Sequence, residues 1–463
     1  MLKYEIVSIL RNKAAYIFLL VVLLFGLKAT VELQRSITSS QDTNYIKREL
    51  QYELVMHRQL LESELATARR DAGDAKRRKF NTNAIQFRKW RIEELQELIA
   101  LLEVGGTESQ QFQKEYKAYG VICSIVSYQM FVYPERGCSP VEVRCADMFQ
   151  KWGRQLGLYD LPFDISSMTA NPYVSSELME ASVAAYENNM GRLEHLLNDY
   201  DKKSLGLDSG SPYAFLETLF CENAYVLTIL DICILLFSFG YIMEGKNDHR
   251  YEFMTVQPYS EWKKYRHYVT SFFVAAGVVC AIGIGVWFLY WEMRCGFDGI
   301  DSHMFVDVKT YKRFYSYEHL EDYSYEGLAR MYADYKYTDG GRGVMLYTTY
   351  PLGSLPLYRF LLYMCILAAL KVLFFAMLGS GIRVLIQHSQ GGIAVVAAAT
   401  VLTGYSQLTG WGKPYNPFAI GSCWNVTLGS ERITWLYAVL ELTFSCILIM
   451  IITCTVSGKK DRI

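Results

Sequence analysis

Two apolar segments joined by a compact charged loop constrain this chain more than any other feature of its sequence. The segments cover residues 222–243 and 268–291. A bilayer core of about 30 Å needs roughly 20 helical residues at 1.5 Å per residue, so each segment is long enough to cross it. We therefore expect a hairpin of two membrane-spanning helices.

The loop inside this hairpin, residues 244–267, is rich in basic side chains. Short loops enriched in Lys and Arg stay on the cytoplasmic side, which predicts a cytoplasmic loop. Pro258 interrupts any continuous helix, and Ser260 stands at the N-cap position of the next helix, with Glu261 in its first turn. We expect a bent helical elbow that another protein could grip. Its basic residues are Lys246, Arg250, Lys263, Lys264 and Arg266.

Composition argues for a membrane protein with long polar segments. The 463 residues carry 46 Lys plus Arg against 47 Asp plus Glu, and this net charge of -1 gives no indication of nucleic-acid binding. Hydrophobic residues reach 51%, yet mean hydropathy is only +0.09, so polar segments must alternate with the spans. The 11 cysteines include no CxxC pair, and a local disulfide between Cys138 and Cys145 is an open alternative.

Further apolar segments predict six spans with both termini in the cytoplasm. The cytoplasmic turn 383–390 and the tail 457–463 both carry basic residues, in agreement with this orientation. The expected fold class is an α-helical polytopic protein of the cell membrane. The predicted spans are residues 14–31, 222–243, 268–291, 357–382, 391–408 and 435–456.

The first residues, 1–13, place apolar side chains on one side of a short helix. This pattern is typical of an amphipathic helix lying at the inner membrane surface. A positively charged flank without defined structure is the alternative. Near the other end of the chain, residues 409–434 form an expected outer loop whose apolar part is too short to cross, so a re-entrant segment is one interpretation of it.

The long segment 32–221 contains no run that could span, so it is expected to form an extracytoplasmic helical stalk and head. Residues 44–70 and 84–103 both have a charged helical pattern, and the linker between them contains Gly73 and Asn81. These two helices predict a hairpin stalk. Solvated helix faces explain their charges better than a specific ligand site does.

A second outer segment, residues 292–356, is rich in tyrosine. A ring with a polar tip suits the headgroup level of a membrane or a packed cap, and a carbohydrate or peptide platform is the alternative. The tyrosines are Tyr311, Tyr315, Tyr317, Tyr323, Tyr325, Tyr332, Tyr335, Tyr337, Tyr347 and Tyr350.

Three ionisable residues, Asp231, Lys371 and Glu441, fall inside predicted spans. Each costs about 2.5 to 3.5 kcal/mol on insertion scales, so such side chains usually face a partner or a wet cavity. Counted from the outer ends of their helices, the two acids lie at similar depth, and the lysine lies one turn deeper. A buried ion set that fixes helix packing is the favoured interpretation, and a polar lining for a transport path is the alternative.

No catalytic motif is present in the sequence. There is no GxxxxGK[ST] loop for nucleotide phosphates, no HExxH, no GxSxG and no Cys/His spacing suited to a nucleophile and base. We therefore expect a chain that is not an enzyme and that binds no metal or cofactor of its own.

The elbow resembles that of the membrane subunit of type-2 ATP-binding-cassette exporters. In that family an acidic residue, an apolar stretch, a Pro-x-Ser turn and a basic residue follow one another between the second and third spans. Glu244, residues 253–256, Pro258 with Ser260, and Arg266 match this order, whereas the family's usual Gly-Thr step is replaced by residues 248–250. The resemblance implies ATPase-docking residues at Glu244, Arg250, Phe253, Pro258, Ser260, Trp262 and Arg266.

The resemblance also implies partners. A separate cytoplasmic ATPase subunit would bind ATP and Mg, the elbow would act as its coupling helix, and a second permease copy or paralogue would complete the transporter. Outward movement of a peptide, lipid or similar amphiphile is the expected function. A mechanical transmitter that drives the outer domain without translocation, and a scaffold or receptor without energy coupling, are the alternatives.

Overall fold

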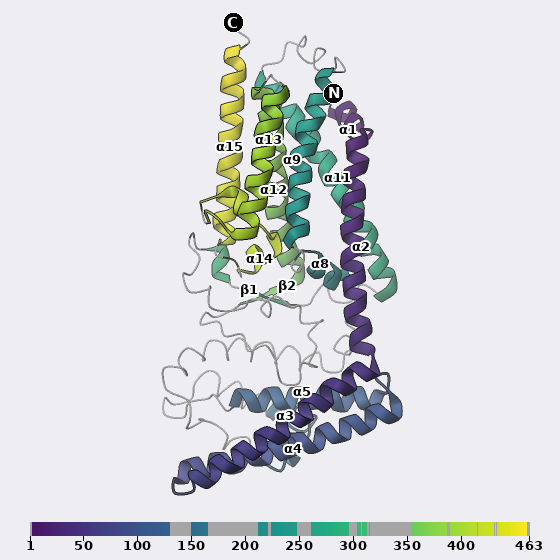
Figure 1. Cartoon of the computed structure of the whole chain (residues 1–463), viewed down its shortest axis with the longest axis vertical. Coiled ribbons are helices and arrows are strands. Elements are labelled where there is room, and N and C mark those ends of the chain that lie inside the picture. The colour runs from purple at the N-terminus through teal and green to yellow at the C-terminus, as the bar shows by residue number, and fades with distance from the viewer. Residues whose placement is uncertain are drawn as a thin grey trace.

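The computed structural model describes residues 2–129, 150–164, 212–220, 224–247, 261–295, 303–306, 308–312, 314, 353–386, 389–413, 415–429, 431 and 433–460. Within these ranges the chain is mostly helical, and it consists of a long helix bundle and a helical hairpin beyond one end of that bundle (Figure 1). Five of the described helices are long and apolar enough to cross a membrane. These findings confirm the expected class of α-helical polytopic membrane protein.

The bundle helices extend beyond the predicted spans at several ends. A short helix, α1 (Leu2–Leu10), precedes them and packs beside α11, with the Ile9 side chain fully buried. The bundle helices are α2 (Lys13–Gln41), α9 (Ala224–Asn247), α11 (Glu261–Cys295), α12 (Leu357–Leu385), α13 (Ser389–Thr409) and α15 (Trp435–Lys460).

Contacts between side chains fix the direction of each bundle helix. Trp287 of α11 donates a hydrogen bond to the Leu23 carbonyl oxygen of α2, and Arg294 donates one to the Gln34 side chain. Residue numbers increase in the same order along both helices, so the two helices run parallel. The contacts of α12 with α9 and with α15 also follow one order along both helices, so α9, α12 and α15 are parallel. The contacts of α13 with α9 follow opposite orders, so these two helices are antiparallel. The end of α9 and the start of α11 therefore lie at one end of the bundle, and the end of α2 lies at the other.

The segment 222–243 corresponds to α9, a helix of 24 residues whose side chains are described over the apolar part Leu227–Tyr241. A small preceding helix, α8 (Pro212–Phe220), packs against α2 and α11 with Phe215 fully buried.

The first bundle helix leads directly into the helical hairpin beyond the end of the bundle, which we call the outer hairpin for that position alone. Asp42 alone separates α2 from α3 (Thr43–Arg70), and its carboxylate accepts the Asn44 amide at 2.9 Å as an N-cap. The next helix, α4 (Ala75–Gly105), returns alongside α3. The expectation that Asn81 lies in the linker is wrong, because α4 starts after its Asp74 cap at Ala75, nine residues before the expected start, and Asn81 is buried within the helix.

A second hydrophobic core holds the hairpin together. It includes α5 (Gln110–Gln129) and a 3-10 turn, η2 (Leu158–Asp160). Trp90 of α4 lies at the centre, with ring centroids 5.9 Å from Tyr119 and 5.7 Å from Phe163. This core is separate from that of the bundle, so the hairpin has its own source of stability.

The two ends of the tyrosine-rich segment pair as a small sheet. Strands β1 (His303–Val306) and β2 (Gly353–Pro356) are antiparallel, with Val306 opposite Gly353. A 3-10 turn, η5 (Val308–Tyr311), follows β1 and places Tyr311 against Tyr363 and Trp435. The other tyrosines predicted to form a headgroup-level surface or packed cap, and the cysteine pair at 138 and 145, lie outside the described residues.

Candidate functional site

The expected docking elbow is described only at its two ends. Glu244 lies in the last turn of α9, and Trp262 and Arg266 lie in the first two turns of α11. The Arg266 side chain is exposed. Four expected docking residues, Arg250, Phe253, Pro258 and Ser260, lie outside the described residues.

Tyr265 anchors the start of α11. Its side chain is buried, and its hydroxyl donates a 2.8 Å hydrogen bond to the Met377 carbonyl oxygen of α12. The neighbouring Arg266 points to the surface. The start of α11 therefore combines an exposed charge with a buried tether to the bundle core, so a force applied there would act on α12 as well as on α11.

Asp231 and Lys371 form an ion pair inside the bundle. Lys371 Nζ lies 2.6 Å from Asp231 Oδ2, and both side chains are more than nine-tenths buried. The pair joins α9 to α12. Two charges at this distance offset most of each other's desolvation cost, whereas either one alone would be strongly unfavourable there.

Two further groups complete this polar centre. Gln407 of α13 donates its amide to Asp231 Oδ2 at 2.8 Å, and Lys371 Nζ also donates to the Gly421 carbonyl oxygen at 2.6 Å. The sequence reasoning missed both. Polar residues at 403, 406 and 407 on one face of an otherwise apolar helix were an available signal for Gln407, whereas a backbone carbonyl leaves no signal in the sequence.

Glu441 takes no part in the Asp231–Lys371 pair. It lies on α15, partly buried, and its Oε2 atom has no hydrogen-bond partner among the described residues. Of the three intramembrane charges, the structure brings two together and leaves the third on another helix.

Residues 415–429 enter the bundle as far as the ion pair. The segment contains the 3-10 turn η9 (Pro417–Ala419) and the short helix α14 (Cys423–Leu428). Phe418 packs against Phe374, with ring centroids 5.4 Å apart, and Trp424 is fully buried against Phe360. Phe374 lies about 25 Å along α12 from Leu357 at 1.5 Å per residue. Lys371 thus joins this inserted segment to α9 and α12.

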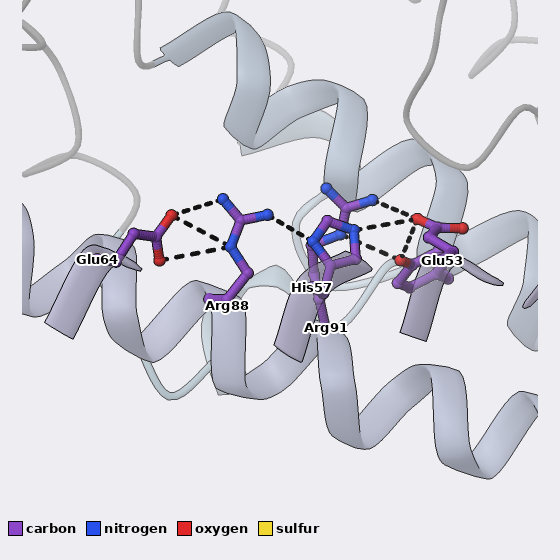
Figure 2. A network of polar contacts seen from close by, with 6 residues as sticks. Glu53, His57, Glu64, Arg88 and Arg91 are labelled. Carbon is purple, nitrogen blue, oxygen red and sulfur yellow. Dashed lines mark hydrogen bonds and ion pairs between the residues drawn. The ribbon is translucent and has the colours of Figure 1, made fainter. Parts of the chain in front are cut away.

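A second polar network, which the sequence analysis did not single out, lies in the outer hairpin (Figure 2). Glu53 Oε1 of α3 receives hydrogen bonds from Arg91 at 2.5 Å and from the Tyr119 hydroxyl at 2.9 Å. His57 bridges Glu53 and Arg88, and Arg88 also pairs with Glu64 at 2.6 Å. The network crosses from α3 to α4 and α5 through the hairpin core.

Burial and charge shift the pKa values in this network in different directions. Burial would raise the pKa of Glu53, but the hydrogen bond from His57, the charge of Arg91 and the Tyr119 hydroxyl together hold it below its ordinary value. Burial raises the pKa of the nearby Cys123 thiol to about 11, which leaves the thiol protonated and unreactive.

Comparisons with known proteins add no family assignment. No protein-family model matches the chain, and no similar protein was found among curated proteins or solved structures. Within the ranges described above, no group of His, Cys, Asp or Glu side chains is arranged to hold a metal ion. Geometry and sequence pattern therefore carry the functional argument.

Proposed function

We propose that this chain is the permease subunit of an ATP-driven exporter in the cell membrane. In this role a separate cytoplasmic ATPase subunit binds ATP and Mg, and a second permease copy or paralogue completes the assembly. The substrate class is a peptide, lipid or similar amphiphile. The observation that supports the proposal best is the placement of the elbow ends, at Asn247 and Glu261, at the end of the bundle opposite the outer hairpin.

The directions of the bundle helices favour six crossings. α2, α11 and α13 run one way and α9, α12 and α15 run the other, so successive helices along the chain alternate in direction. With this alternation both termini lie on the side of the elbow, and the basic elbow assigns that side to the cytoplasm. In agreement with this alternation, α9 runs parallel to α12 and packs against α12, α13 and α2.

Coupling would follow from a population shift. An ATPase pair that binds the elbow differently in its open and closed forms changes the relative free energy of the two bundle conformations. Tyr265 and Trp287 of α11 donate hydrogen bonds to α12 and α2, respectively, so a displacement of α11 would be transmitted directly to both helices. Lys371, which joins α9, α12 and the inserted segment 415–429, is the contact that must rearrange if a path opens there.

The test of this proposal is charge reversal in the elbow. The Arg250→Glu/Arg266→Glu variant, reconstituted with the partner ATPase, should lose stimulation of ATP hydrolysis because the ATPase cleft meets the wrong charge. Arg35→Glu is the matched control, since Arg35 is exposed on α2 near the opposite end of the bundle. Equal stimulation of ATP hydrolysis by the wild type, the double variant and Arg35→Glu would reject energy coupling through the elbow and favour a scaffold or receptor.

A second candidate, mechanical transmission to the outer hairpin, is favoured by one specific observation. α2 continues unbroken for 29 residues, about 43 Å, and only Asp42 separates it from α3. Three side chains of α11, at Trp287, Trp291 and Arg294, bond α2 along its length. Motion of α11 would therefore reach the hairpin through a stiff connection.

A flexible insertion separates the two candidates. Four Gly/Ser residues placed after Asp42 should abolish ATP-dependent motion of the hairpin, measured by spin-label distances, and should leave translocation intact if the chain is an exporter. The same insertion at Gly73, in the turn between α3 and α4, is the control because nothing lies within 4 Å of a Cβ built there. Hairpin motion without any translocation in the wild type and the Gly73 control, lost only with the Asp42 insertion, would favour mechanical transmission.

A further inference from the structure

His57 of the outer hairpin has a polar partner at each ring nitrogen. Its side chain on α3 is only 2% exposed and faces α4. Arg88 Nη1 lies 2.5 Å from Nδ1, and Glu53 Oε1 lies 3.3 Å from Nε2 (Figure 2). A guanidinium can only donate and a carboxylate can only accept, so Nδ1 must carry the lone pair and Nε2 the hydrogen. The structure therefore requires neutral His57 in one tautomer.

The charges around His57 balance only in this state. Carboxylates come from Glu53 and Glu64 on α3, and cations come from Arg88 and Arg91 on α4. From α5, Tyr119 and Cys123 face the network, and burial keeps both protonated by raising their pKa values. Two cations and two carboxylates therefore surround a neutral ring, and a proton on Nδ1 would add a third positive charge directly against the Arg88 guanidinium.

We infer that His57 is a proton-operated latch between α3 and α4: protonation at Nδ1 breaks the Arg88 contact and opens the hairpin core. Arg88 holds two α3 residues at once, His57 and Glu64, so loss of the first contact leaves the side chain paired only at the half-buried Glu64. The inference concerns the outer hairpin alone and does not depend on what drives the helix bundle.

The direction of the pH response follows from linkage. Burial, Arg91 and Arg88 lower the pKa of His57 and outweigh the hydrogen bond to Glu53, so the closed hairpin resists the proton while an open one takes it up near the ordinary value of about 6.5. The latch is then fully effective above that pH and weakens as pH falls below it. If His57 stays unprotonated in the closed form, the equilibrium constant for opening the hairpin should be roughly 30-fold larger at pH 5 than at pH 8.

Hydrogen exchange on the full chain in lipid nanodiscs tests the latch. We expect the amides of α3 around His57 and of α4 around Arg88 to exchange roughly 30-fold faster at pH 5 than at pH 8, after correction for the intrinsic pH dependence of exchange. His57→Asn places a carbonyl oxygen where Nδ1 stands and cannot take up the proton. This variant should show no change over the same pH range.

Two more variants keep the outcome decisive. Arg88→Gln removes the one of the two opposing cations that contacts Nδ1, so its pH response should fall below the wild-type ratio even if the hairpin is less stable. His267→Asn, on α11 in the bundle, should keep the full response. A wild-type hairpin whose exchange does not change between pH 8 and 5, or a His57→Asn variant with the wild-type response, would overturn the inference.

Discussion

Gly379 of α12 packs directly against Ser238 of α9. A Cβ at position 379 would overlap Ser238 Oγ and would lie 2.5 Å from the Leu235 carbonyl oxygen, which is backbone and cannot rotate away. Ser238 Oγ donates to that same carbonyl at 2.9 Å and to the Phe375 carbonyl oxygen at 3.5 Å. The close approach of the two helices brings Asp231 and Lys371, on the same pair of helices, within ion-pair distance.

We predict that Gly379→Ala destabilises the bundle by about 1–3 kcal/mol, because the added methyl must push the two helices apart. Gly240→Ala is the matched control on α9, where nothing lies within 4 Å of the new methyl. The control should be neutral or slightly stabilising, since alanine has the higher helix propensity. Unfolding of the purified variants in detergent measures both effects, and equal stabilities would contradict the close approach.

We predict that Lys371→Met is strongly destabilising, by about 3–5 kcal/mol, because Asp231 then remains buried without its counter-charge. The double variant Lys371→Met/Asp231→Asn should recover most of this loss, since no unpaired charge remains. Thermal unfolding and transport assays on the two variants are the measurements. If the single variant retains both stability and transport, neither a packing role nor a transport role for the pair can stand.

Trp424, fully buried within the segment 415–429, and Trp435, which is partly buried, should respond differently to phenylalanine. Trp424 Nε1 has no hydrogen-bond partner among the described residues, whereas Trp435 Nε1 donates to the Tyr363 carbonyl oxygen at 3.0 Å. Trp424→Phe should therefore be close to neutral, and Trp435→Phe should cost about 0.5–1.5 kcal/mol for the lost bond. The reverse order in unfolding experiments would show that the segment 415–429 is seated differently.

Glu53 should give the hairpin a second, more acidic pH response. Its pKa is held below the ordinary value of about 4.3, so its stabilising contribution is complete above that pH and is lost as pH falls below it. In the His57→Asn variant, which lacks the histidine response, we expect hairpin opening, measured by hydrogen exchange, to increase up to about tenfold between pH 5 and 3.3.

Two substitutions assign this acidic response. In the His57→Asn background, Glu53→Gln should remove the increase and should raise exchange already at pH 7, because Arg91 loses its buried counter-charge. Glu62→Gln, exposed on the same helix, should behave like His57→Asn alone in that background. An unchanged acid response in Glu53→Gln would assign it to another carboxylate.

The sequence by itself determined the helical class, because runs of about 20 apolar residues leave only a bundle of long helices as a stable arrangement. It also indicated an ion set of Asp231, Lys371 and Glu441, since charges inside apolar helices need partners. Only the tertiary structure decided that Asp231 pairs with Lys371 while Glu441 stays apart, that Gln407 and the Gly421 carbonyl complete the pair, and that strands close the tyrosine-rich segment. These features depend on which helices are neighbours and on backbone groups. Helix neighbours and backbone contacts cannot be recognised in a single sequence, because they correspond to no periodicity and to no residue type.

The same division holds in the outer hairpin. Charged helical patterns at 44–70 and 84–103 are local properties, and they correspond to α3 and α4. The start of α4 depended on the Asp74 cap, and the His57 network depended on the register between two helices some 30 residues apart in the chain. Register is set by packing over the whole interface, so a buried histidine with both ring nitrogens occupied becomes visible only once the helices are placed against each other.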